Sequence, residues 1–104
     1  MPGHVVVFIT AGSAEEGHKI AHALVEERLA ACVNIIAPIQ SVYRWQDLVR
    51  NDQEVLLMVK TVAGKMEDLA RRVRQLHSYE VPEIIALPIV AGAQDYLRWL
   101  DDQT

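Results

Sequence analysis

The chain has 104 residues, of which 51% are hydrophobic and 23% charged, a balance typical of one globular domain over residues 1–104 and not of a disordered chain. Its net charge of -4 and the absence of any long lysine and arginine run argue against nucleic acid as a partner. Cys32 is the single cysteine, and no apolar run approaches the roughly 20 residues of a membrane span, so we expect a cytoplasmic protein without a membrane partner.

A strand and a helix are predicted first. Residues 4–10 (HVVVFIT) are apolar and β-branched at nearly every position, which is typical of a central strand covered on both faces. Ser13 and Glu16 then have the spacing of a capping box, in which each side chain binds the other residue's amide. The helix that follows should end near Arg28, and its apolar stripe consists of Ile20, Ala21, Leu24 and Val25.

A long hairpin is expected next. Residues 30–36 and 40–45 are rich in strand-forming residues and predict one strand with an irregularity at Pro38. Asp47 and residues 50–52 are typical of a turn. The chain should then return as a strand over residues 54–61.

The last third of the chain predicts two helices around a strand. Gly64 precedes a helix that should close at His77. The narrow apolar face of this helix consists of Met66, Leu69, Val73 and Leu76. Residues 84–90 are the most apolar strand candidate, and Gly92 introduces a short terminal helix. One side of that helix carries Tyr96, Trp99 and Leu100.

This order predicts an α+β fold, the ferredoxin-like βαββαβ arrangement with a short C-terminal helix, in which two helices cover one face of a four-stranded antiparallel sheet. Residues 55–59 and 84–90 are nevertheless apolar at almost every position, so both faces of the sheet require cover. We expect other copies of the chain to cover the second face, because large exposed apolar patches usually mark interfaces. The alternative is a monomer whose apolar sheet stays exposed.

The stretch from His77 to Glu83 (HSYEVPE) is the best candidate for a functional site. It places an imidazole, a phenol and two carboxylates where Pro82 enforces the change from helix to extended chain. His77 is either an imidazolium stabilised by the helix dipole or a functional ligand. Glu83 precedes an apolar run, so its carboxylate is expected to point at a cation such as Lys60.

Cys32 lies in a predicted strand, where a lone cysteine is usually a small buried hydrophobe. The alternative is a ligand for copper or zinc, because a thiolate with an imidazole suits these metals and a trimer would supply several copies. Catalysis by Cys32 with His77 as base is disfavoured, because nothing orients the pair. We interpret His4, His18 and His22 as surface residues; His18 and His22 stand four apart on one helix, but no third ligand is visible.

Large amphipathic rings are numerous for a chain with one phenylalanine: Tyr43, Trp45, Tyr79 and Trp99. Such rings are favoured at interfaces and pocket mouths, and core packing is the alternative. The sequence lacks the CxxC motif of a soft-metal chaperone and the strand signature of an RNA-binding domain. It also lacks a glycine-rich loop for a nucleotide, and no organic cofactor is expected.

Five motifs occur in order: residues 31–34 (ACVN), 41–45 (SVYRW), 54–61 (EVLLMVKT), 77–83 (HSYEVPE) and 96–99 (YLRW). Together they resemble the signatures of the CutA divalent-cation tolerance family. The resemblance implies a ferredoxin-like subunit, a homotrimer and a non-enzymatic cytoplasmic role linked to copper and other divalent metals. It further implies metal contacts at Cys32 and His77 and a cleft between subunits lined by Tyr43, Trp45, Lys60, Tyr79 and Glu83.

Two positions depart from the family pattern. Asp47 replaces a glycine of the hairpin, which aspartate should tolerate because it adopts left-handed conformations more readily than most residues. Ile9 replaces a second cysteine found in some relatives, which weakens a copper site. The preferred hypothesis is a trimer that binds divalent cations weakly or serves metal homeostasis through a partner. The alternative is a trimeric signalling module that binds a small anionic metabolite beside Lys60.

Overall fold

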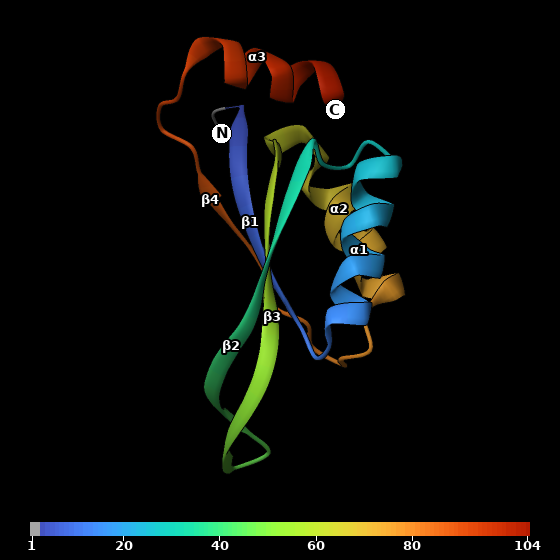
Figure 1. The fold of residues 1–104 in the computed structure, drawn as a ribbon, viewed down its shortest axis with the longest axis vertical. Helices are drawn as coiled ribbons and strands as arrows, with labels where there is room; N and C mark the ends of the chain where they lie inside the picture. The colour runs from blue at the N-terminus through green and yellow to red at the C-terminus, as the bar shows by residue number, and fades with distance from the viewer. Residues whose placement is uncertain (1–2) are drawn as a thin grey trace.

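Four strands and three α-helices make up the computed structural model, which describes residues 3–104 (Figure 1). The elements are β1 (His4–Ala11), α1 (Ala14–Glu26), β2 (Cys32–Trp45), β3 (Leu48–Val62), the 3₁₀ turn η1 (Ala63–Lys65), α2 (Met66–Leu76), β4 (Ile84–Pro88) and α3 (Gln94–Gln103). The strands form one antiparallel sheet in the order β2-β3-β1-β4. This order confirms the predicted ferredoxin-like arrangement.

β1 is a central strand, as predicted, because it pairs with β3 on one side and with β4 on the other. Its burial alternates along the strand: Val5, Val7 and Ile9 are fully buried, whereas Val6 and Phe8 are only partly covered. Successive side chains of a strand point to opposite faces of the sheet. One face of β1 is therefore completely covered within the chain, and the other is not.

The covered face carries the hydrophobic core, because α1 and α2 both pack against it (Figure 1). Core side chains with no exposed surface are Val5, Val7, Ile9, Ile20, Leu24, Leu57, Val59, Leu69 and Val73. The prediction that Val25 belongs to the apolar stripe of α1 was wrong. Its neighbour Leu24 is fully buried, whereas Val25 points away from the sheet and is 42% exposed. α1 also ends at Glu26, two residues early, and the chain leaves the helix through Arg28 in a left-handed conformation (φ 58°).

β2 and β3 form a hairpin whose far end extends beyond the rest of the molecule (Figure 1). The register shifts between Ile36 and Ile39, which confirms the irregularity predicted at Pro38. The tight turn lies at Gln46 and Asp47, whose φ angles are 50° and 65°, as expected for Asp47. The turn predicted at residues 50–52 was wrong, because these residues pair with β2 as part of β3.

β4 is shorter than the predicted strand over residues 84–90. The Ile89 amide donates to the carbonyl of His4, where β1 begins, so no strand remains for later residues to pair with. Val90 is 90% exposed. The edge strand therefore stops where its neighbour stops.

We call the side of the sheet opposite α1 and α2 the outer face. Its apolar residues follow from the strand register and are Val6, Phe8, Ile36, Leu56, Met58, Ile85 and Leu87. Three of them are strongly exposed: Ile36 by 40%, Ile85 by 52% and Leu87 by 49%. α3 lies across one end of the sheet, where it buries Leu100 (Figure 1). The outer-face residues on the middle strands β1 and β3 are partly buried, so the strongly exposed apolar residues lie on the edge strands β2 and β4.

Candidate functional site

The candidate site begins at His77, the residue that ends α2. Its backbone is extended (φ -84°, ψ 140°), so the chain turns away from the helix here and passes the end of β1. The imidazole Nε2 lies 2.6 Å from the carbonyl oxygen of Thr10, and Nδ1 accepts the Tyr79 amide at 3.1 Å. A carbonyl accepts and an amide donates, so His77 is the neutral tautomer with its proton on Nε2. His77 is therefore a buried structural tie between α2 and β1.

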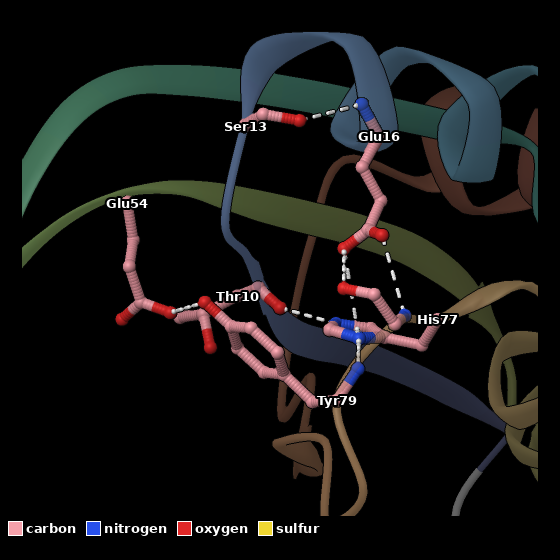
Figure 2. Close-up of polar contacts among 7 residues, drawn as sticks. Thr10, Ser13, Glu16, Glu54, His77 and Tyr79 are labelled. Carbon is pink, nitrogen blue, oxygen red and sulfur yellow. Dashed lines mark hydrogen bonds and ion pairs between the residues drawn. The ribbon is translucent and has the colours of Figure 1, made fainter.

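Glu16 binds the same segment from the first turn of α1. Its carboxylate accepts from the amide and the hydroxyl of Ser78 at 3.2 and 3.1 Å, and lies 3.7 Å from His77 Nδ1 (Figure 2). Ser13 caps α1 by accepting the Glu16 amide at 3.1 Å, as predicted. The reciprocal half of the capping box was wrong, because the Glu16 carboxylate binds Ser78 instead of the Ser13 amide. The helix start and the site loop are thereby joined.

Tyr79 connects this loop to the hairpin. Its hydroxyl donates to Glu54 Oε2 at 2.7 Å, and its ring lies against His77 with centroids 4.7 Å apart (Figure 2). Burial and then the Glu54 hydrogen bond raise the pKa of Tyr79, so the phenol stays protonated and donates to the carboxylate. A Cβ at Gly12 would lie 3.1 Å from the Tyr79 hydroxyl, so glycine leaves room for this hydroxyl.

A cleft of about 730 Å³ opens beside Tyr79, between the hairpin and the segment that follows α2. It is lined by Thr10, Ser41, Val42, Tyr43, Trp45, Arg50, Glu54, Ser78, Tyr79, Glu80, Val81 and Glu83. The lining contains three glutamates and one arginine, so its formal charge is negative. Tyr43 donates to Asp52, and this hydrogen bond is the main cause that raises the pKa of Tyr43. The cleft combines aromatic rings with carboxylates.

Four of the residues assigned by resemblance to a cleft between subunits line this cleft within one chain: Tyr43, Trp45, Tyr79 and Glu83. None of the four is a core residue, so the core-packing alternative does not hold for the rings among them. Lys60 is absent from the lining, and its ammonium donates to Asn34 on the outer face. The predicted contact between Glu83 and Lys60 was wrong, because Glu83 is exposed in the cleft.

Cys32 lies at the other end of the sheet. Its thiol is 3.9 Å from Asn34 Oδ1, and it adds to the effect of burial in raising the pKa of Tyr96 on α3. In the strand register, Cys32 of β2 lies opposite Lys60 of β3, and Lys60 lies opposite Val6 of β1. His77 binds the carbonyl of Thr10, which lies four residues further along β1 than Val6. At about 3.3 Å per residue, this separates Cys32 and His77 by roughly 13 Å along the sheet. One chain does not bring the two predicted metal contacts together.

Two residues that line the cleft, Glu54 and Arg50, were not predicted as site residues from the sequence. Glu54 fits the pattern of an ordinary strand residue and Arg50 that of a turn residue, although both line the cleft. Both belong to one polar run, residues 50–54 (RNDQE), so their polarity alone did not mark them as site residues. Within residues 3–104, no group of three or more histidines, cysteines, aspartates or glutamates is placed to hold a metal ion. No helix in that range is both long and apolar enough to span a membrane.

Comparisons with known proteins cover nearly the whole chain. The family model described as CutA1 divalent ion tolerance protein matches residues 5–103. The divalent-cation tolerance protein CutA of Thermus thermophilus is 56% identical over 99 residues, which cover 95% of this chain and 96% of that protein. The chloroplastic protein CutA of Arabidopsis thaliana is 47% identical over 100 residues; these cover 96% of this chain and 55% of the relative, so this chain spans about half of the plant protein.

The fold comparison agrees with the sequence comparison. The solved structure of the divalent cation tolerance protein Cut A1 from Thermus thermophilus matches with a TM-score of 0.95 and 54% identity. The match covers 97% of this chain and 98% of that chain. The helices, sheet order and hairpin described above thus have a close experimental counterpart.

Proposed function

Because the chain belongs to the CutA1 divalent ion tolerance family, we propose that it serves divalent-cation tolerance as a non-enzymatic protein of metal homeostasis. The family match over residues 5–103 is the observation that carries this proposal. Copper is the metal we propose first, with zinc as a second candidate, because thiolate and imidazole ligands suit both.

The charge of the cleft favours a cation over an anion. Its lining includes Glu54, Glu80 and Glu83 but only one cation, Arg50. The alternative of a small anionic metabolite required Lys60, which lies on the outer face and not in the cleft. Carboxylates attract cations and repel anions at close range. The cleft thus disfavours the anion alternative, although neither Cys32 nor His77 lines it.

We also propose that the chain is a homotrimer. The uncovered outer face supports this, because Ile36, Ile85 and Leu87 each leave at least 40% of their surface exposed on one side of the sheet. Contiguous apolar surface of this kind marks interfaces. Light scattering at micromolar concentration should report about three times the subunit mass of 11.7 kDa. A single-subunit mass would overturn the trimer.

Cys32 and His77 stay predicted metal contacts. In one chain they lie far apart, and both nitrogens of His77 are already hydrogen-bonded. A site that contains both would therefore have to draw them from different subunits and release His77 from one partner. Cys32 is only partly buried, so its thiol is the more accessible of the two.

Calorimetric titration of the full chain with Cu²⁺ and Zn²⁺ tests this proposal. Heat of binding that is lost in Cys32→Ser or His77→Ala supports it. Circular dichroism must show that each variant stays folded, because removing the buried His77 ring breaks two hydrogen bonds. Lys60→Ala is the control: it should keep the metal heat, whereas heat from an anion panel that only Lys60→Ala abolishes would favour the alternative.

A cytoplasmic location is part of the proposal. It is supported by the single cysteine, which leaves Cys32 without a partner for an internal disulfide. The plant relative is described as chloroplastic, so location differs within the family. Fractionation of cells that express the native protein checks this point, and recovery from a membrane or extracellular fraction would overturn it.

A further inference from the structure

The four histidines of the chain differ in how their ring nitrogens are used. His77 is hydrogen-bonded through both nitrogens, and His4 Nε2 lies 2.9 Å from Asp101 Oδ1. His18 and His22 make no hydrogen bond or ion pair with any residue from 3 to 104, and both side chains are exposed. These two imidazoles are therefore open to a ligand from solution.

His18 and His22 also lie next to each other. They are four residues apart on α1, a spacing that places two side chains on the same helix face with about 5–6 Å between their Cβ atoms. Their ring centroids are 6.3 Å apart, and the ring planes differ by 29°. At this spacing, rotation about the side-chain bonds can aim one nitrogen of each ring at a common point.

The helix beneath the pair is held in place. Ile20 and Leu24 bury its opposite face against the sheet, and Ser13 caps its start. A packed and capped helix does not have to form when a ligand binds, so little ordering cost opposes chelation. His18 and His22 are both exposed on α1. α1 packs on the side of the sheet opposite the outer face (Figure 1), so the pair lies away from the surface proposed to be covered in a trimer.

We propose that His18 and His22 chelate one Cu²⁺, Ni²⁺ or Zn²⁺ ion on the surface of α1. Neutral imidazole is a preferred ligand of these ions, and two histidines at this helical spacing bind zinc in helix-borne sites. The hard cations Mg²⁺ and Ca²⁺ prefer oxygen ligands and should not compete. No third protein ligand is in place within residues 3–104, so water completes the coordination and the ion stays exchangeable.

The charges around the pair are mixed. Glu15 precedes His18 by three residues and Glu26 follows His22 by four, so both lie one turn away on the same side of the helix. Lys19 is the neighbouring cation, and it lies on the flank beside His18. Two carboxylates against one ammonium leave the local field favourable to a divalent cation.

This inference goes beyond the proposed function, because it involves neither Cys32 nor His77 and does not depend on a trimer. Calorimetric titration of the full chain with Ni²⁺ tests it, since Ni²⁺ avoids the thiol oxidation that Cu²⁺ can cause. We expect saturable binding of one ion per chain and no binding of Mg²⁺. Because the second imidazole binds intramolecularly, His18→Ala and His22→Ala should each weaken Ni²⁺ binding about tenfold or more.

Two further variants separate chelation from other effects. Combining His18→Ala with Glu26→His places a histidine four residues after His22 and should restore binding, because the spacing and not the position matters. His4→Gln removes a histidine outside the pair and should leave the Ni²⁺ affinity unchanged. Circular dichroism should show the same helix content in every variant.

Three results would overturn the site: no Ni²⁺ binding by the unaltered chain, unchanged affinity in both single alanine variants, or no recovery with Glu26→His. Its failure is distinguishable from that of the proposed function, since the latter is tested with Cys32→Ser and His77→Ala. Loss of binding only in those two variants would support the earlier proposal and reject this one.

Discussion

Tyr79 and Tyr43 both donate a hydrogen bond to a carboxylate, but their surroundings differ. The partner of Tyr79 is Glu54, of which only 8% is exposed, whereas the partner of Tyr43 is the exposed Asp52. Burial is the first cause that raises the pKa of Tyr79, and the hydrogen bond is the first cause at Tyr43. A buried carboxylate cannot replace a lost donor with water as readily as an exposed one.

Tyr79→Phe should therefore lower the free energy of unfolding by about 1–2 kcal/mol. This is the lower part of the range for a buried group that loses its hydrogen-bond partner, because Tyr79 is 38% exposed. Tyr43→Phe is the matched control and should change the free energy of unfolding by less than about 0.5 kcal/mol. Urea denaturation at one fixed protein concentration measures both. Equal losses in the two variants would contradict the assigned role of Glu54.

The raised pKa of Tyr79 also predicts how stability depends on alkaline pH. The unfolded tyrosine ionises near its ordinary value of 10.0, whereas the folded one ionises only at higher pH. The contribution is complete below pH 10 and is lost as the pH rises through the folded pKa, because the unfolded state gains from ionising first. Urea midpoints between about pH 8 and 11 should fall more steeply for the unaltered chain than for Tyr79→Phe.

At the scale of elements, α1 packs closely on β3 through Gly17. A Cβ at this position would lie 2.9 Å from Val55 Cγ2 and 3.5 Å from Leu57 Cδ2. Both partners belong to the buried face of β3, and the side chain of Val55 is branched and only 5% exposed. The neighbour therefore has little room to move, and glycine sets how closely helix and strand approach.

Gly17→Ala should destabilise the protein by about 1 kcal/mol. Alanine favours a helix over glycine by about 1 kcal/mol, but overpacking a core costs about 1–3 kcal/mol, so the steric effect outweighs the helical one. Gly64→Ala is the control, because nothing lies within 4 Å of its added Cβ. Gly64→Ala should be as stable as the unaltered chain or more stable. Thermal melting should therefore give a lower melting temperature for Gly17→Ala than for Gly64→Ala.

At the scale of the whole molecule, the outer face is the feature that one chain leaves incomplete. Phe8 pairs with Ile85 in the register of β1 and β4, and both point away from α1 and α2. Ile85 is 52% exposed on this face, whereas Val25 is 42% exposed on the helical side of the molecule. The two residues are alike in chemistry and exposure but differ in the face they occupy.

Ile85→Asp should abolish the trimer, because a carboxylate buried at an apolar interface loses its hydration without gaining a partner. Val25→Asp should leave the mass of the trimer unchanged, because the exposed face of α1 that carries Val25 stays in water. Light scattering of both variants at the same micromolar concentration measures the difference. Trimers from both variants would show that the outer face is not the interface.

The sequence was informative wherever one residue pattern sufficed. The strand pattern of residues 4–10, the cap at Ser13 and the left-handed turn at Asp47 all predicted local structure that the fold confirms. It failed at the turn predicted over residues 50–52, at Val25 in the stripe of α1, and where a side chain had a choice of partners. Glu16 binds Ser78, 62 residues away, and Lys60 binds Asn34 instead of Glu83.

Burial alternation, caps and helix periodicity are properties of neighbouring residues, so the order of elements, the ferredoxin-like sheet and the family followed from the sequence by itself. Which polar groups meet depends on strand register and on loops that bring distant segments together, and only the tertiary structure decided that. It placed Glu54 beside Tyr79 and separated Cys32 from His77. It also left His18 and His22 as the two histidines in which neither ring nitrogen is hydrogen-bonded to a residue from 3 to 104. The physical reason is that a hydrogen bond or metal contact requires atoms within about 3 Å, a precision that one-dimensional patterns do not contain.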